Sequence, residues 1–234
     1  RRSTSGSPCA VASRRSCPNG DGGSAGVCGP PLSRILGGRF KTYEIPILEW
    51  NDSIPVVEQA LEALAPTLML SIERPGVAAS GRYTNMHGED ISAFTAKFDL
   101  FFELGTCPTI AFGDGGNEVG MGNVGHLLGD LPVRPSRTTC DELVIATVSN
   151  WGVYGVIAEL SRMLDEDLFT LFEPVTILSY LMSNGGLDGV TTEATPTEDG
   201  FPMDVGAQII AQLRGALAPK DEESPRMPER SSHD

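Results

Sequence analysis

A glycine-rich acidic segment contains the residue types best suited to chemistry. It runs from Gly113 to Asn123 and places Asp114, Asn117 and Glu118 among glycines. Carboxylate and amide oxygens on such a backbone are ligands for a hard divalent cation, and two carboxyls can also act as an acid/base pair. The same residues fit a plain turn, in which glycine supplies positive φ and Asp and Asn bond their own backbone. Both interpretations stay open from the residues alone.

Residues 120–125 match the sequence pattern GxGxxG of dinucleotide-binding sites. We expect no nucleotide there, because Asp114 and Glu118 bring negative charge to the place where a pyrophosphate would bind. Gly129 and Pro132 also interrupt the helix that the motif requires.

Two more polar segments follow apolar runs. Glu73 and Arg74 come directly after Thr67–Ile72, and Asn150 comes after Leu143–Val148. Adjacent residues on a strand point to opposite sides, so Glu73 and Arg74 need not pair with each other. Arg74 can then bind a substrate carboxylate through two hydrogen bonds, and a structural ion pair is the alternative.

Strands and helices alternate along the chain and position these polar segments. The apolar runs that predict strands are 43–48, 67–72, 107–112 and 143–148. The helical patterns are 53–65, a stretch that opens at Asp90 and carries Phe94, Phe98 and Phe101, and then 151–164, 175–182 and 203–217. This order predicts an α/β fold with a mainly parallel sheet flanked by helices. Ligands bind beyond the carboxyl ends of strands in such sheets, so the three polar segments are expected to converge on one crevice.

Composition excludes several classes of partner. The 234 residues include 31 acidic and 17 basic ones, and a net charge of −14 repels phosphate backbones and anionic lipid. We therefore expect neither nucleic acid nor a membrane as a partner, while a homo-oligomer is compatible with the sequence. The five cysteines form no CxxC pair and are odd in number, which argues against a disulfide framework or structural zinc and favours a reducing compartment.

One α/β domain is expected at residues 41–218, between a disordered or loosely attached segment at 1–40 and a disordered tail at 219–234. Residues 1–40 are rich in Arg, Ser, Gly and Pro and show no apolar periodicity, and residues 219–234 are charged and contain proline. The first segment has the composition of an organelle transit peptide. A linker left from a larger chain is the alternative, and the first residue, which is not Met, favours it.

Several consecutive segments together resemble the C-terminal D-glutamate cyclase-like domain family. They are IERPG at 72–76, GRYTNMHGEDIS at 81–92, GDGGNEVGMGNV at 113–124, VSNWGVYG at 148–155, NGGLDGVT at 184–191 and EATPTEDGFP at 193–202. The resemblance implies an α/β lyase that converts D-glutamate to 5-oxo-D-proline with loss of water. It also implies a divalent cation, Mg²⁺ or Mn²⁺, in an acidic pocket and a location in the mitochondrial matrix or the cytoplasm. Relatives usually open this domain with a TDGPxG-type segment, which the residues before Tyr43 do not match.

Roles for single residues follow from this chemistry as hypotheses. Glu73, Asp114 and Glu118 are assigned to acid/base transfer and to metal ligation, and Arg74 to a substrate carboxylate. The other expected substrate-binding residues are Tyr83, Asn85, Asn117, Asn123 and Asn150, with Asp199 as a further pocket member. Two other functions remain open: a metal-dependent hydrolase of a small phosphorylated or amide substrate, and a non-catalytic amino-acid-binding remnant.

Overall fold

A six-stranded sheet in the order β3-β2-β1-β4-β5-β6 forms the centre of the protein. The computed structural model describes residues 10–14, 24–28, 42–129, 133–171, 173–191 and 193–217. The strands are β1 (Ala10–Arg14), β2 (Ser24–Cys28), β3 (Thr42–Glu44), β4 (Pro66–Ile72), β5 (Thr109–Gly113) and β6 (Glu142–Ile145). β1 is antiparallel to both of its neighbours, whereas the β2–β3, β4–β5 and β5–β6 pairs are parallel. The predicted mainly parallel sheet is confirmed, and the carboxyl ends of β4, β5 and β6 meet at one edge.

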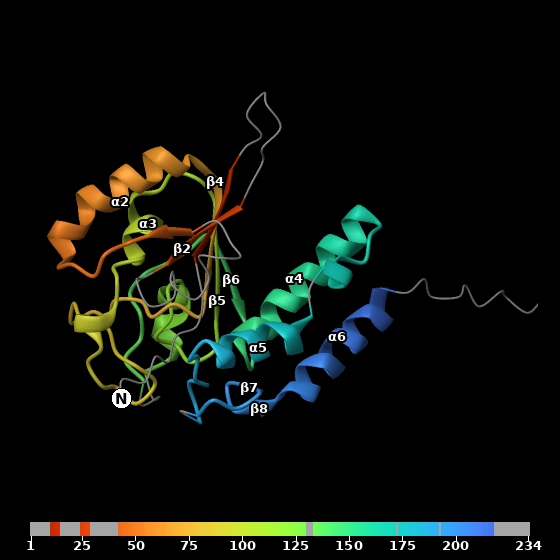
Figure 1. Cartoon of the computed structure of the whole chain (residues 1–234). Coiled ribbons are helices and arrows are strands. Elements are labelled where there is room, and N and C mark those ends of the chain that lie inside the picture. Colours follow the sequence, from red (N-terminus) through yellow and green to blue (C-terminus); the bar gives the residue numbers. More distant parts are fainter. Residues whose placement is uncertain are drawn as a thin grey trace, which may run out of the picture.

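Helices cover both faces of this sheet (Figure 1). They are α2 (Trp50–Leu64), α3 (Asp99–Leu104), α4 (Ser149–Leu164), α5 (Pro174–Ser183) and α6 (Met203–Leu217). α2 and α3 lie on one side, and α4, α5 and α6 gather on the other together with the short hairpin of β7 (Thr197–Glu198) and β8 (Phe201–Pro202). Within the described ranges, the structure contains no helix whose length and apolar content would let it span a bilayer.

The apolar core explains why α2 forms where the sequence pattern predicts it. Val57, Ala60 and Leu64 recur at helical spacing, and all three are buried in one cluster with Met69 of β4 and Phe101 of α3. Buried side chains of α4, α6 and the 168–171 turn form a second cluster. The sheet edge between these two clusters is thereby held in place from both sides.

A continuous helix opening at Asp90 is predicted by the apolar pattern, and this prediction is wrong. A single 3₁₀ turn follows Asp90, and α3 begins only later in the chain. The ammonium group of the buried Lys97 donates hydrogen bonds to the backbone carbonyls of Ser92, at 3.1 Å, and Thr95, at 2.8 Å. These carbonyls therefore bond a side chain where a continuous helix would supply backbone N–H groups.

Two strands lie within residues 1–40, where no regular structure is expected from the sequence. The β1 backbone pairs with β4 in the register Val11↔Leu70 and Ala12↔Met69. The expectation therefore fails for β1 and β2, which are short and rich in small residues and form through pairing with distant segments. The rest of residues 1–40 and the tail at 219–234 lie outside the described residues, and the domain limits at 41 and 218 stay predictions.

A buried carboxylate, Asp99, ties α3 to the loops beside the sheet. The Asp99 side chain accepts hydrogen bonds from the Val77 N–H at 2.9 Å, the Tyr83 hydroxyl at 2.5 Å and the Thr138 hydroxyl. Asp99 is 0% exposed, and Tyr83 is buried as well. Burial, followed by the negative charge of Asp99, raises the pKa of Tyr83 far above its ordinary value. The Tyr83 hydroxyl, assigned above to substrate, thus has a partner inside the protein.

Removing this carboxylate is expected to destabilise the protein strongly. Asp99→Ala leaves three buried donors without their acceptor, each at a cost of about 1–3 kcal/mol, so the free energy of unfolding should fall by at least about 3 kcal/mol. Tyr83→Phe removes one of these donors and should cost only about 1 kcal/mol. Chemical denaturation measures both variants. A smaller loss for Asp99→Ala than for Tyr83→Phe would contradict the proposed bonding.

Candidate functional site

Three carboxylates come together beyond the carboxyl ends of β4 and β5. Glu73, Asp114 and Glu118 each offer an oxygen, and these oxygens lie within 4.8 Å of one another. Glu73 directly follows β4 and Asp114 directly follows β5, and the parallel register Ile72↔Phe112 sets the two strand ends side by side. The structure thus brings together the three residues that the sequence analysis assigns to acid/base transfer and metal ligation.

The backbone at Glu73 is held in the left-handed region, with φ at 53°. This conformation is uncommon for a residue with a side chain, and it persists where neighbouring contacts fix it. The Glu73 N–H donates to the Phe112 carbonyl at 3.1 Å, and the Val119 N–H donates to the Arg74 carbonyl at 2.8 Å. The chain that leaves β4 is therefore bound to β5 and to the middle of the glycine-rich segment.

Glu118 holds the glycine-rich segment in its folded form. Its two carboxylate oxygens accept the N–H groups of Gly115, at 2.9 Å, and Gly116, at 2.7 Å. Gly116 has φ at 105°, and a Cβ on Gly120 would lie 2.3 Å from the Cβ of Ala111. The glycine-rich segment is therefore both a glycine-dependent turn and an acidic site, because the turn holds the carboxylates in place. A 3₁₀ helix follows at Met121–Leu127, in place of the α-helix of a dinucleotide site.

Asp114 joins the acidic loop to the start of α4. Its Oδ2 atom accepts the backbone N–H of Ser149 at 3.0 Å and the Ser149 hydroxyl at 3.2 Å. Val148 at the N-cap position of α4 makes no capping side-chain hydrogen bond, and Asp114 bonds the first turn from another loop. The positive end of the α4 dipole therefore lies beside the acidic cluster, where it favours negative charge.

Crowding of these carboxylates shifts their protonation. Burial first, and then the charges of Asp114 and Glu118, raise the pKa of Glu73 to about 9, although a hydrogen bond with Ser149 acts in the opposite direction. Burial also raises the pKa of Glu118, while the N–H group of Gly115 lowers it in part. The Glu73 Oε2 atom is buried and has no hydrogen-bond partner among the described residues. A carboxyl in this position is stable with a proton or beside a cation.

A fourth carboxyl, that of Asp199, reaches the cluster from the turn between β7 and β8. Burial, then the charges of Asp114 and Asp188, raise the pKa of Asp199 to about 7, and a hydrogen bond with Asp114 adds to this shift. From the sequence, Asp199 is expected only as a further pocket member. The Glu-Asp-Gly turn at 198–200 is the only local signal that marks it.

Arg74, Asn117 and Asn150 lie on the elements that surround the cluster. The Arg74 guanidinium carbon is 3.9 Å from the centre of the Phe98 ring, a cation–π contact that fixes the plane of the side chain. The Asn117 amide donates to the Thr84 carbonyl at 3.0 Å. The Asn150 amide points towards Glu198, whose Oε1 atom is 3.4 Å away.

Asn85 bonds within its own turn, and Asn123 bonds the segment that leads into β6. The Asn85 Oδ1 atom accepts the backbone N–H groups of His87, at 3.0 Å, and Glu89, at 2.9 Å. Asn123 exchanges hydrogen bonds with the Cys140 backbone at 3.1 Å and 2.9 Å. Their assignment to substrate stays a prediction.

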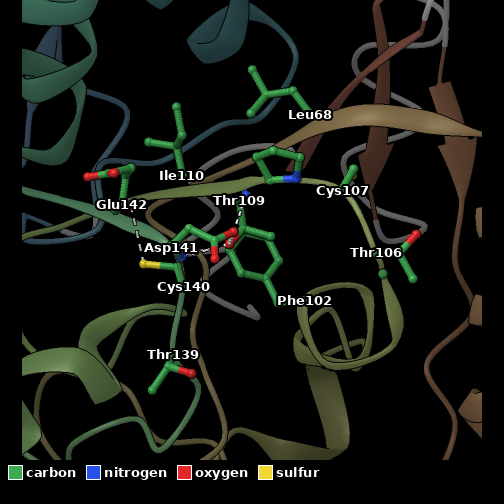
Figure 2. A pocket seen from close by; sticks show the side chains of 12 residues that line it. Leu68, Phe102, Thr106, Cys107, Thr109, Ile110, Thr139, Cys140, Asp141 and Glu142 are labelled. Atoms are coloured by element: carbon green, nitrogen blue, oxygen red, sulfur yellow. Dashed lines mark hydrogen bonds between the residues drawn. The ribbon is translucent and has the colours of Figure 1, made fainter.

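A hollow of about 640 Å³ lies at the opposite end of β5 (Figure 2). Asp141 on its wall accepts the backbone N–H and the hydroxyl of Thr109, at 2.8 Å and 2.9 Å, and so joins the starts of β5 and β6. Burial raises the pKa of the Cys140 thiol to about 11, and it raises the pKa of Cys107 as well. Both thiols are therefore protonated and weakly nucleophilic at neutral pH, which leaves the acidic cluster as the candidate site.

The fold and the cluster together define an α/β protein with a carboxylate-lined site at the carboxyl edge of a parallel sheet. The chain belongs to the family described as D-glutamate cyclase-like, C-terminal, whose model matches residues 33–214. One relative is the human protein named "D-glutamate cyclase, mitochondrial", which is 38% identical over 140 residues. The match covers 53% of this chain and 22% of the human protein, so the chain spans about a fifth of that relative's length.

Replacing Glu73 is expected to change how stability depends on pH. Folding raises the pKa of Glu73 from 4.5 to about 9, so the folded state keeps a proton that the unfolded chain releases. The stabilisation from this proton is complete below the unfolded pKa and is lost as the pH rises through the folded pKa. Glu73→Gln lacks this loss, so in the presence of a chelator its melting temperature should exceed that of the wild type near pH 9 and approach it near pH 5. If the melting temperatures of the two proteins change with pH in the same way, the pKa of Glu73 is not raised by folding and the expectation is wrong.

Proposed function

We propose that this protein is a lyase that cyclises D-glutamate to 5-oxo-D-proline with loss of water. The observation that carries the proposal is the cluster of Glu73, Asp114 and Glu118 at the sheet edge, in a chain of the D-glutamate cyclase-like family. The name of the human relative supports a D-glutamate cyclase and a mitochondrial location. The proposed location is the mitochondrial matrix, with the cytoplasm as the alternative.

The reaction moves two protons from a nitrogen atom to an oxygen atom. The α-ammonium group of glutamate becomes an amide N–H, so it gives up two protons. One γ-carboxylate oxygen leaves as water, so it takes up two protons, and no net proton is exchanged with solvent. A site that holds one protonated and one ionised carboxyl can carry out both transfers. Because the attack is intramolecular, binding the substrate in a folded conformation removes much of the entropic barrier.

Two of the carboxyls lie in surroundings that support a role in these transfers. Glu73, with its pKa raised to about 9, carries a proton at neutral pH and donates it to the departing oxygen. Asp114, held by two hydrogen bonds from Ser149, accepts a proton from the substrate amine. Arg74 binds a substrate carboxylate, and the amides of Asn117 and Asn150 donate hydrogen bonds to the oxygen on which negative charge develops.

A divalent cation, Mg²⁺ or Mn²⁺, fits the same three carboxylates. They offer oxygen atoms within 4.8 Å of one another, and the buried Glu73 Oε2 atom has no hydrogen-bond partner in the described part of the chain. When bound, such a cation would polarise the γ-carboxyl group and offset the repulsion between an acidic site and an anionic substrate. Glu73, Asp114 and Glu118 are the residues that would hold it, and Glu73 would then be an ionised ligand, so its role as proton donor applies to the cation-free site.

Product analysis with D- and L-glutamate tests the proposed activity. The wild type should form 5-oxoproline from D-glutamate and release neither ammonia nor phosphate. Asp114→Asn should lower kcat by at least about 100-fold, because one carboxylate of the acid/base pair is lost. Glu58→Gln, on an exposed position of α2, removes the same charge and should keep wild-type activity. No product from the wild type, or a fully active Asp114→Asn, would overturn the proposal, and released ammonia or phosphate would indicate a hydrolase.

Melting curves with and without Mn²⁺ test the cation site separately from turnover. Added Mn²⁺ should raise the melting temperature of the wild type and of Glu58→Gln by the same amount, because a ligand that binds only the folded state stabilises it. The shift should be much smaller for Glu73→Gln and Asp114→Asn. Equal shifts in all four proteins would place Mn²⁺ elsewhere.

A further inference from the structure

A second buried carboxylate, that of Glu198, lies next to the acidic cluster and is not part of it. Glu198 is 7% exposed. Its Oε1 atom accepts the Tyr154 hydroxyl at 2.8 Å, and its Oε2 atom accepts the Trp151 indole N–H at 3.1 Å. Both donors belong to α4, so Glu198 fastens the β7–β8 hairpin to that helix. Trp151 also packs on Phe201 of β8, with 5.1 Å between the ring centres.

The neighbouring residue, Asp199, points the other way, into the acidic cluster. Its backbone has φ at 48°, a left-handed conformation that a residue with a side chain rarely adopts. This turn sends the Glu198 side chain to α4 and the Asp199 side chain to Asp114, with which it shares a hydrogen bond.

Asp188 fixes the hairpin from its other side. Its carboxylate accepts the backbone N–H groups of Thr191, at 2.7 Å, and Gly200, at 3.0 Å, as well as the Thr197 hydroxyl at 2.8 Å. The strained turn is therefore anchored on both flanks by carboxylates. Only the Glu198 anchor leads to α4, whose first residue, Ser149, in turn bonds Asp114.

We propose that Glu198 is a positioning residue of the acidic site, which fastens the hairpin to α4 and thereby holds Asp199 against Asp114. Asp199 is then the fourth carboxyl of the site, held beside Asp114. The helix α4 connects the two groups. Its Ser149 bonds Asp114, and its Trp151 and Tyr154 bond Glu198. The proposal deepens the proposed function and rests on it for its kinetic test.

A double-mutant cycle with Glu198→Ala and Asp199→Asn tests this role. Glu198→Ala alone should lower kcat by roughly 10-fold to 100-fold with a smaller change in KM, because it displaces a reacting group and not a binding group. In the Asp199→Asn background the same substitution should have almost no further effect on kcat, since Glu198 acts through Asp199. Tyr154→Phe keeps the ring and removes one donor to Glu198, so it should lower kcat in the same direction by less. Glu193→Ala, an exposed glutamate of the same loop, should behave as the wild type.

Calorimetric binding of Mn²⁺ gives the same cycle a readout that does not depend on turnover. Glu198→Ala should weaken Mn²⁺ binding in the wild type and leave it unchanged in the Asp199→Asn background. If the wild type forms no 5-oxoproline but this binding cycle is non-additive, the proposed function fails and the positioning role stands. Three results would each overturn the proposal. The first is additive effects in both cycles, and the second is a folded Glu198→Ala variant with wild-type kcat and Mn²⁺ binding. The third is a wild type that neither turns over D-glutamate nor binds Mn²⁺.

Discussion

Repulsion between carboxylates in a half-buried space is the constraint on which this end of the molecule depends. Glu73, Asp114 and Glu118 lie within 4.8 Å of one another, and like charges at such distances cannot all stay ionised without compensation. The chain compensates locally: backbone N–H groups of the glycine-rich segment bond Glu118, Ser149 bonds Asp114, and Glu73 keeps a proton. The resulting mixture of protonated and ionised groups is the chemical property that the proposed reaction uses.

The fold converges on this cluster because parallel strands end at one edge. β4 and β5 deliver Glu73 and Asp114, α4 begins against Asp114, and the β7–β8 hairpin beside the first turns of α4 carries Asp199. Glu73 and Asp199 both have left-handed backbones, so two of the segments that deliver side chains to the site hold an uncommon backbone conformation. A conformation of this kind is maintained only where surrounding contacts hold it, and each of these segments is bonded to a neighbouring element.

Sequence reasoning found the parts of the site that depend on local order and missed the parts that depend on distant contacts. The runs at 67–72 and 107–112 correspond to β4 and β5, and the acids that follow them meet as expected. The helix predicted from Asp90 does not form, because the buried Lys97 donates hydrogen bonds to backbone carbonyls in this stretch. β1 and β2 were not predicted, because they depend on pairing with other strands of the sheet. Glu198 gave no signal, because a glutamate in a polar turn normally points to solvent and its partners lie on another helix.

The raised pKa of Glu73 is the central physical claim, and it can be measured directly in the cation-free protein. Carboxyl ¹³C NMR of glutamate-labelled protein, with the Glu73 signal assigned by its disappearance in Glu73→Gln, follows the titration of this one group. A midpoint near 9 in the wild type, and a lower one in Asp114→Asn, is the result expected from burial beside two acids. A midpoint near 4.5 that is unaffected by Asp114→Asn would mean that the carboxylates do not interact, and the shared acidic site would have to be abandoned.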